Sequence, residues 1–549
     1  MATYRVSPTE GVDSAGRSGS TSEPWATWAY LDTRVSAASG DIYLQDSGTT
    51  ARENIPTSLI GADRITLGVY GGSEYATISG ADVATGFVWN ATYEVWEKTI
   101  ATGWNVQVAE VPLTFVAWAS TLAATAVRMT DYSFSYDSTG GKLYIKSPEC
   151  PDGCEVSARQ YVIGDSGAAR AGLYIEGLRL LGAYRHNVHI GTKTGARIRQ
   201  CHFGVCGGEY TSGIYLGNHI DFYEDNNDWV IEQSVFEDAF DASISPQLRN
   251  LSNKTARGQV FRRNTIRRAG YAGIEATCNG TTQRIDGNLI IENLIEDCGR
   301  GWSGDRNGRG IMLSNNSLDT GNYISGFYVA KNTMRRCKTG ILLRDTAAVN
   351  VIGPNEIDDV QYGVVFRQGV AASGHEDHVR GVIVRRASVA AYYVSGSNNG
   401  VHGSASATQA MTVTLTNCEA DECAQGVVNT TNANATVTVK NFAFRGDGRA
   451  FNCSVGTFAE TYSRVDEAGT PGATLDATSV QANLGAYKEG NGALVMPDTA
   501  TWATLATDNA LAAAGTYVEG VQLMTGRMRP GSCPIGAYGA VLPGAARSS

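Results

Sequence analysis

The chain has little proline, no long apolar run and no cluster of basic residues. Among its 549 residues there are 13 Pro against 64 Gly, which indicates many tight turns. No apolar run approaches the length of a membrane span, so we expect no membrane insertion. The formal net charge of -10 is spread along the chain, so nucleic acid is not an expected partner.

Signals for secretion, disulfides and metals are also sparse. The first residues, MATYRVSPTEGVDSAG, lack a basic segment followed by an apolar one, so we expect either a cytosolic protein or one that leaves the cell without a signal peptide. The 11 Cys are an odd number on a long chain, which argues against a disulfide framework. Cys150 and Cys154 either close a small loop or are both unpaired. No Cys/His spacing indicates zinc, and we expect no metal and no cofactor.

Four short stretches share one pattern: NTIRRAG, NLIEDCG, NTMRRCK and NEIDDVQ. In each, an Asn is followed by an apolar residue two positions later, two charged residues and a small apolar residue. Gly and alternating apolar residues come next. Successive Asn residues are 29, 39 and 23 positions apart, so a constant core carries insertions of variable length, as in a solenoid. Because the apolar residues alternate with period two, the repeating units are predicted to be strands.

Stacking of such units explains the exchanged charges. Equivalent residues of successive coils should lie about 4.8 Å apart, and like charges directly opposite one another would be destabilising. The charged positions alternate in sign from coil to coil, which indicates control of register rather than catalysis. The Asn positions are predicted to form an internal ladder of side-chain amides. The charged columns are Glu237, Arg267, Glu296, Arg335 and Asp358, and Asp238, Arg268, Asp297, Arg336 and Asp359; the Asn column is Asn264, Asn293, Asn332 and Asn355.

This frame resembles the right-handed parallel β-helix of the pectate-lyase-like superfamily, which includes polysaccharide lyases, glycoside hydrolases, epimerases and bacteriophage tailspikes. The resemblance covers about residues 40–450 and implies an all-β solenoid. We expect an N-terminal arm at 1–39, an inserted β subdomain at about 85–160, and a C-terminal cap or oligomerisation segment at 451–549. The aromatic residues of the insert are expected to pack in its core rather than to stack on sugars.

The insertions are expected to wall a groove on one side of the solenoid. Loops 207–213 and 299–310 fall at one corner, and loops 217–229 and 315–326 fall at the next. A groove walled by loops suits an elongated glycan. The outward column between the two corners is predicted to be His189, Tyr215, Ser243, Glu275, Met312 and Leu342.

Hydrolysis of a glycan needs two carboxyl groups flanking the bond, one of them as an acid. For each candidate acid the alternative is an ordinary solvated residue of a strand or turn. A lyase would instead need a base such as Arg306, Arg309 or His219 beside a neutralised uronate, often with calcium. The predicted catalytic residues are Glu275, Asp241 and Asp305, and the predicted substrate-binding residues are Trp302, Tyr215, Glu209, Arg306 and Arg309.

The leading hypothesis is therefore a tailspike-like protein of a bacteriophage that binds and cleaves a bacterial surface polysaccharide. The resemblance implies a homotrimer located in the virion, and the N-terminal arm is the candidate for docking to other phage tail proteins. One alternative is an extracellular bacterial polysaccharide lyase or hydrolase that works alone. Another is a non-catalytic β-helical adhesin or structural protein.

Overall fold

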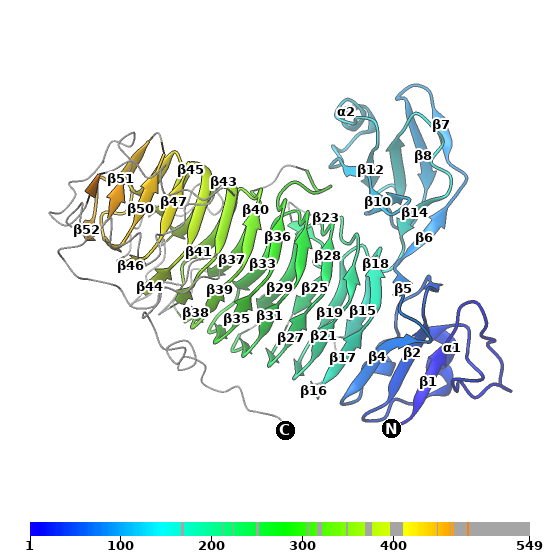
Figure 1. Cartoon of the computed structure of the whole chain (residues 1–549). Coiled ribbons are helices and arrows are strands. Elements are labelled where there is room, and N and C mark those ends of the chain that lie inside the picture. Colours follow the sequence, from blue (N-terminus) through cyan, green and yellow to red (C-terminus); the bar gives the residue numbers. More distant parts are fainter. Residues whose placement is uncertain are drawn as a thin grey trace. The chain divides into compact units, whose positions relative to one another are not determined.

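Nearly all the regular secondary structure in the described part of the chain is β-strand, as Figure 1 shows for the computed structural model. It forms two compact units, Met1–Ser325 with Arg335–Leu342, and Gly326–Met334 with Leu343–Ser549. None of the described helices is both long and apolar enough to cross a membrane. The structure describes residues 1–165, 169–211, 214–222, 224–248, 252–304, 307–315, 321–346, 350–367, 376–395, 410–446, 448–461, 463–465 and 480–481.

In the first unit, each coil of the solenoid contributes strands to three faces. Every pairing between coils is parallel, which confirms the predicted β-helix. Face 1 consists of β4 (Ile65–Tyr70), β17 (Leu173–Glu176), β21 (Arg197–Arg199), β27 (Val230–Glu232), β31 (Val260–Arg262) and β35 (Leu289–Ile291).

Faces 2 and 3 follow face 1 within each coil, and Figure 1 shows the strands of face 3 side by side. Face 2 consists of β5 (Ala76–Ser79), β18 (Leu178–Leu181), β22 (His202–Phe203), β28 (Val235–Glu237), β32 (Thr265–Arg267) and β36 (Leu294–Glu296). Face 3 consists of β15 (Tyr161–Asp165), β19 (His186–Ile190), β25 (Ile220–Phe222), β29 (Ala242–Leu248), β33 (Ala272–Cys278) and β37 (Arg309–Asn315).

The second unit is built from the same kind of coil. β51 (Arg449–Cys453) and β53 (Arg464–Val465) continue the parallel ladders, so the coils run beyond residue 450, where the sequence predicts the cap. Of the residues after 465, only 480–481 are described. One ladder of this unit is β39 (Tyr328–Ala330), β42 (Asn350–Ile352), β44 (Glu376–Arg380), β46 (Met411–Thr416), β49 (Ala435–Lys440) and β52 (Thr457–Thr461).

Residues 1–39 are packed onto the end of face 1 instead of forming a separate arm. β1 (Thr3–Val6) pairs in parallel with β2 (Ile42–Asp46), which pairs with β4. Helix α1 (Trp28–Arg34) buries Trp28, whose Nε1 donates a hydrogen bond to Gln45 Oε1 at 2.8 Å. The short strand TYRV has no repeat signature, which is why the sequence pattern misses it. This segment covers a sheet edge that would otherwise be open to further pairing.

The inserted β subdomain predicted at 85–160 is present and begins at β6 (Ala81–Ala84). Phe115, Phe134 and Tyr136 are buried in its core, whereas Trp89 is 44% exposed. Cys150 and Cys154 are both free. Its two sheets are β10-β9-β14-β6 and β11-β12-β13-β8-β7, with β7 (Val88–Asn90), β8 (Val95–Thr99), β9 (Val106–Val108), β10 (Val111–Pro112), β11 (Thr114–Phe115), β12 (Ser133–Asp137), β13 (Lys142–Lys146) and β14 (Cys154–Ser157).

An Asn ladder runs through the buried turn between faces 1 and 2. The backbone N–H and the Nδ2 of Asn264 both donate to Asn293 Oδ1 at 3.0 Å. Asn293 Nδ2 in turn donates to the carbonyl of Phe261 at 2.9 Å. The preceding residues, Arg263 (φ 55°) and Glu292 (φ 59°), have left-handed backbones, which turn the chain sharply there. The predicted ladder is confirmed, and it repeats between Asn332 and Asn355 in the second unit.

The alternating charges are also confirmed within the first unit. Glu237, Arg267 and Glu296 occupy successive rungs, and Arg267 contacts the carboxylates on both sides at 3.6 and 3.3 Å. Arg268 binds Asp238 through two hydrogen bonds of 2.8 Å. Arg336 binds Asp297 in the same way, at 2.8 and 2.9 Å. Asp358 belongs to the second unit, where it pairs with Arg386.

We predict that Asn293→Ala destabilises the protein by about 1–3 kcal/mol, because the buried donors of Asn264 and the carbonyl of Phe261 lose their partner. Urea unfolding measures the loss. Asn307→Ala removes an exposed amide and serves as the control. Equal stability of the two variants would contradict a structural role for the ladder.

Candidate functional site

The outward side of face 3 carries a column of polar side chains. The register places His189 beside Asp221 and Asp221 beside Ser245. Because Ile244 pairs with Ile274, Ser245 lies beside Glu275, which in turn pairs with Met312. The residue directly before each of these on its strand is 0% exposed and fills the solenoid core; these residues are Val188, Ile220, Ile244, Ile274 and Ile311. His189, Asp221, Ser245, Glu275 and Met312 therefore form one column, here called the outer column.

The prediction of Tyr215 and Ser243 in this column is wrong. Tyr215 lies in the antiparallel hairpin of β23 (Glu209–Thr211) and β24 (Ile214–Leu216), opposite Tyr210. The segment GIYL copies the repeat pattern of Gly and apolar residues but leaves the coil. The strand that belongs to the coil is β25 (Ile220–Phe222), and it places Asp221 in the outer column. The alternation of apolar residues in the segment HIDF is the sequence feature that indicates this strand. Ser243 lies two residues before Ser245 on β29, so it is not in line with Asp221 and Glu275.

Asp221 is surrounded by hydrogen-bond donors. His189 Nδ1 lies 2.9 Å from its Oδ2, and Asn218 Nδ2 donates to its Oδ1 at 3.0 Å. His186 Nε2 lies 3.7 Å from the same Oδ2. Tyr161 stacks on His189 with ring centroids 4.5 Å apart and planes 10° apart, which fixes the imidazole. The carboxylate is buried, whereas the His189 side chain is 14% exposed, so His189 is where this cluster reaches the surface.

Glu275 is two rungs from Asp221, with Ser245 between them. Gln247 Nε2 donates to its Oε2 at 2.7 Å, and Thr277 Oγ1 donates to its Oε1 at 3.0 Å. Ser245 Oγ donates to Oε2 at 3.3 Å. With rungs about 4.8 Å apart, the two carboxyl-bearing residues are separated by about 9–10 Å along the column.

Asp241 and Arg309 lie at the corner where face 3 begins. Asp241 is four residues before Ser245, or about 13 Å along the strand at 3.3 Å per residue. It lies one coil away from Glu275, as predicted, but too far along the strand for the two carboxylates to meet. The Arg309 guanidinium lies 4.3 Å from the ring centroid of Tyr271, whose backbone N–H donates to the Asp241 carbonyl. Asp305 and Arg306 lie outside the described residues.

Glu209 forms an ion pair with Arg185, near the end of the outer column that carries His189. It forms two hydrogen bonds with Arg185, one of them 2.8 Å long. This pairing raises the pKa of the Arg185 guanidinium, so the arginine stays charged beside Tyr161. Burial raises the pKa of the Tyr161 hydroxyl. Glu209 thus acts in this structure by positioning Arg185, and its predicted contact with substrate stays a prediction.

His219 is unsuited to the role of a base. It is completely buried, and burial lowers its pKa to about 3. Its Nε2 lies 3.1 Å from the Gly204 carbonyl and 3.0 Å from the Glu237 carbonyl, so this nitrogen carries the hydrogen. His219 therefore ties two backbone segments together inside the solenoid.

His186, His189 and Asp221 present nitrogen and oxygen atoms that all lie within 4.8 Å of one another. The backbone N–H of Asn218 donates to His186 Nδ1 at 3.1 Å. The neutral ring then carries its hydrogen on Nε2, the nitrogen that faces Asp221. A metal would need a lone pair there, so this arrangement fits a hydrogen-bonded cluster better than a metal site.

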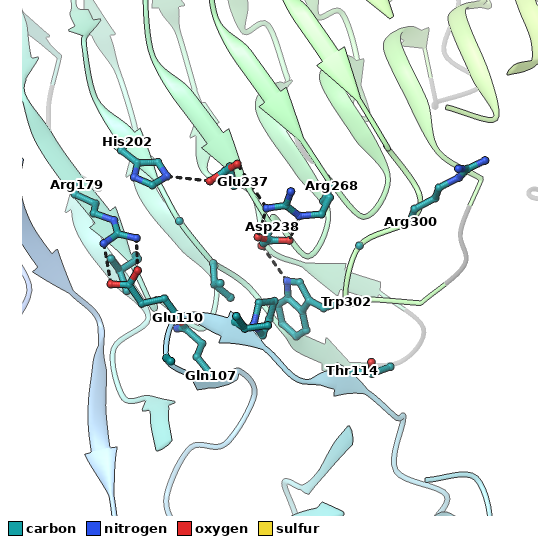
Figure 2. A pocket seen from close by; sticks show the side chains of 17 residues that line it. Gln107, Glu110, Thr114, Arg179, His202, Glu237, Asp238, Arg268, Arg300 and Trp302 are labelled. Atoms are coloured by element: carbon teal, nitrogen blue, oxygen red, sulfur yellow. Dashed lines mark hydrogen bonds and ion pairs between the residues drawn. The ribbon is translucent and has the colours of Figure 1, made fainter. Parts of the chain in front are cut away.

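A cleft of about 610 Å³ lies between the insert and face 2, here called the insert cleft (Figure 2). Arg179 of β18 holds Glu110 of the insert through two hydrogen bonds of 2.7 and 2.6 Å. His202 Nε2 lies 3.3 Å from Glu237 Oε2. The pair of Arg268 and Asp238 completes the charged wall. The lining therefore combines charged residues of face 2 with a hairpin of the insert.

Trp302 lines this cleft but is almost fully packed. Its Nε1 donates to the Asp238 carbonyl at 2.9 Å, and its ring centroid lies 4.6 Å from that of Phe240. The ring is 6% exposed and belongs to the core that joins the insert to the coils. Little of its surface remains for the sugar stacking that the sequence predicts.

Comparisons with known proteins show similarity of chain path only. No family model and no curated protein matches the chain. The complex of XylC with xylose is 13% identical, with a TM-score of 0.49 over 87% of this chain and 86% of that one. The catalytic unit of the thermostable GH87 α-1,3-glucanase from Streptomyces thermodiastaticus is 13% identical, with a TM-score of 0.37 over 86% and 69%. PfbA, a surface adhesin of Streptococcus pneumoniae, is 12% identical, with a TM-score of 0.33 over 83% and 93%.

Glu237 is expected to make stability sensitive to acid. Its pKa is lowered from 4.5 to about 2, first by the hydrogen bond from His202; burial opposes this, and the charges of Arg268 and Arg267 assist it. The stabilisation is present above pH 4.5 and is lost as the pH falls through about 2. We predict that Glu237→Gln flattens this loss in urea unfolding measured across that range. The same pH dependence in both proteins would contradict the assignment.

Proposed function

We propose that this protein hydrolyses a polysaccharide, with Asp221 and Glu275 of the outer column as the two catalytic carboxyl groups. The observation that carries the proposal is their register: both project from face 3, two rungs apart, with Ser245 between them. Inverting glycosidases separate their carboxyl groups by about 6.5–9.5 Å, to leave room for a water molecule, and retaining ones by about 5 Å. The two-rung spacing of about 9–10 Å lies at the upper limit of the inverting range and well above the retaining one.

Hydrogen bonds hold both carboxyl groups in place. His189 and Asn218 contact Asp221, and Gln247, Thr277 and Ser245 donate to Glu275. In the proposed reaction Asp221 is the base that removes a proton from water. Glu275 then acts as the acid and protonates the leaving glycosidic oxygen. The water oxygen bonds to the anomeric carbon as the bond to the leaving oxygen breaks. His189 orients Asp221 and is the more exposed member of the pair.

The finer part of the proposal concerns the substrate and setting. A bacterial surface polysaccharide suits a long parallel β-helix, because the rungs of face 3 repeat along the direction in which a glycan chain would extend. A tailspike-like role in a homotrimer accords with the same fold. In that case residues 1–39, which pack on the end of face 1, would present their outer surface to other tail proteins.

We predict that Asp221→Asn and Glu275→Gln each lower the rate of cleavage of capsular or lipopolysaccharide glycans by about 10²–10⁴-fold, since each removes an acid or base. Appearance of new reducing ends measures the rate. The control is Glu176→Gln, which changes an exposed acid on face 1. Full activity in both column variants would reject this assignment of the site, and retention of the glycan without cleavage would indicate an adhesin.

Elimination is a second candidate, favoured by the contact between His189 and Asp221. A histidine held by a carboxylate can remove the proton next to a uronate carboxyl group; a carbon–carbon double bond then forms as the neighbouring glycosidic carbon–oxygen bond breaks, and the departing oxygen takes up a proton. In that case the products carry an unsaturated uronate, which ultraviolet absorbance detects. His189→Ala is then expected to lower the rate at which the absorbing product forms by about 10²-fold or more. New reducing ends without absorbance would exclude this chemistry.

A further inference from the structure

We propose that the insert cleft is a second carbohydrate site, separate from the outer column, which binds a neutral saccharide. The cleft lies at face 2 and the insert, whereas the outer column lies on face 3. Its volume of about 610 Å³ is within the range of pockets that hold small organic ligands. Nothing in the proposed hydrolysis uses its lining residues.

The side chain of Gln107 is the first observation that points to a ligand. Gln107 forms part of the cleft lining on β9, and its side chain is 0% exposed. Its Nε2 and its Oε1 both lack a hydrogen-bond partner among the residues that the structure describes. Buried amides are nearly always satisfied, and Gln107, unlike the equally unpartnered Asn105, lies in the lining of a cleft large enough to hold a ligand. A sugar hydroxyl both donates and accepts, and could therefore satisfy either end of this amide.

The charges of the cleft favour a neutral ligand over an anionic one. Glu110 is neutralised by Arg179, Asp238 by Arg268, and Glu237 faces His202. These pairs hold polar atoms in fixed positions but leave no concentration of positive charge. Arg300 also contributes to the lining, and Figure 2 shows its side chain directed away from the paired groups.

The hairpin of the insert supplies a wall that is held in place. Ala109 (φ 48°) and Glu110 (φ 65°) form its tip with left-handed backbones, although neither is glycine. The hydrogen bonds from Arg179 to Glu110 fasten this strained tip to face 2. Val111, 64% exposed, and Pro112 add apolar surface next to the polar groups. Apolar surface beside fixed polar groups matches a sugar ring, which has both kinds of surface.

The test measures binding of three probes to the full-length Glu275→Gln protein by calorimetry. Cellotriose and laminaritriose are neutral, and trigalacturonate is anionic. We expect a neutral trisaccharide to bind, and Gln107→Met to weaken it about tenfold or more without lowering stability, because an apolar isostere removes an unsatisfied amide. The matched control is Asn105→Leu, which also changes a buried amide without partners among the described residues, outside the cleft lining.

A second pair of variants guards against misfolding of the first. Thr114→Tyr fills the cleft from an exposed position on β11, and Thr99→Tyr adds the same ring to an exposed strand position on β8, outside the lining. We expect only Thr114→Tyr to abolish binding. The proposal is overturned if no neutral probe binds or if trigalacturonate alone binds. It is also overturned if Gln107→Met and Thr114→Tyr bind the neutral probes as tightly as their controls do. Because the assay measures binding, its outcome does not depend on whether the outer column cleaves glycans.

Discussion

Parallel pairing of successive coils is the constraint on which the rest of the structure depends. Each rung must meet the next in register, because a shift by one residue would turn the core face outward. Two features maintain that register. In the solenoid interior, the side-chain oxygen of Asn293 accepts hydrogen bonds from the backbone N–H and the Nδ2 of Asn264. On the outer surface, acidic and basic residues alternate from coil to coil. Left-handed residues at the turns, such as Arg263 and Asp238, direct the chain from one face to the next.

This register is also what brings functional groups together. Asp221 and Glu275 are 54 positions apart in the sequence, yet they lie two rungs apart on one column. The insert cleft arises by the same means, because the charged residues of face 2 stack into a wall against which the hairpin rests through Glu110 and Arg179. Loops and insertions can therefore vary without moving the groups that the coils carry.

The sequence allowed the fold to be predicted better than the site. The Asn and charge columns recur at positions that only a stacked coil explains, and the structure contains both. Tyr215 was misplaced because GIYL in the hairpin imitates the local pattern of a coil strand, and local pattern cannot tell which of two similar strands pairs with the next coil. Asp221 was missed for the same reason. The burial of Trp302 depends on contacts with the insert, which is distant in the sequence, and the repeat pattern holds no information about such contacts.

The stereochemistry of the product tests the central claim most directly. Two carboxyl groups on alternate rungs leave room for water between the base and the sugar, so the first product released should have the inverted anomeric configuration. Proton NMR of a reaction followed from its start identifies that anomer. Inversion is the result that this account predicts. Retention would require carboxyl groups on adjacent rungs and would contradict the pairing of Asp221 with Glu275.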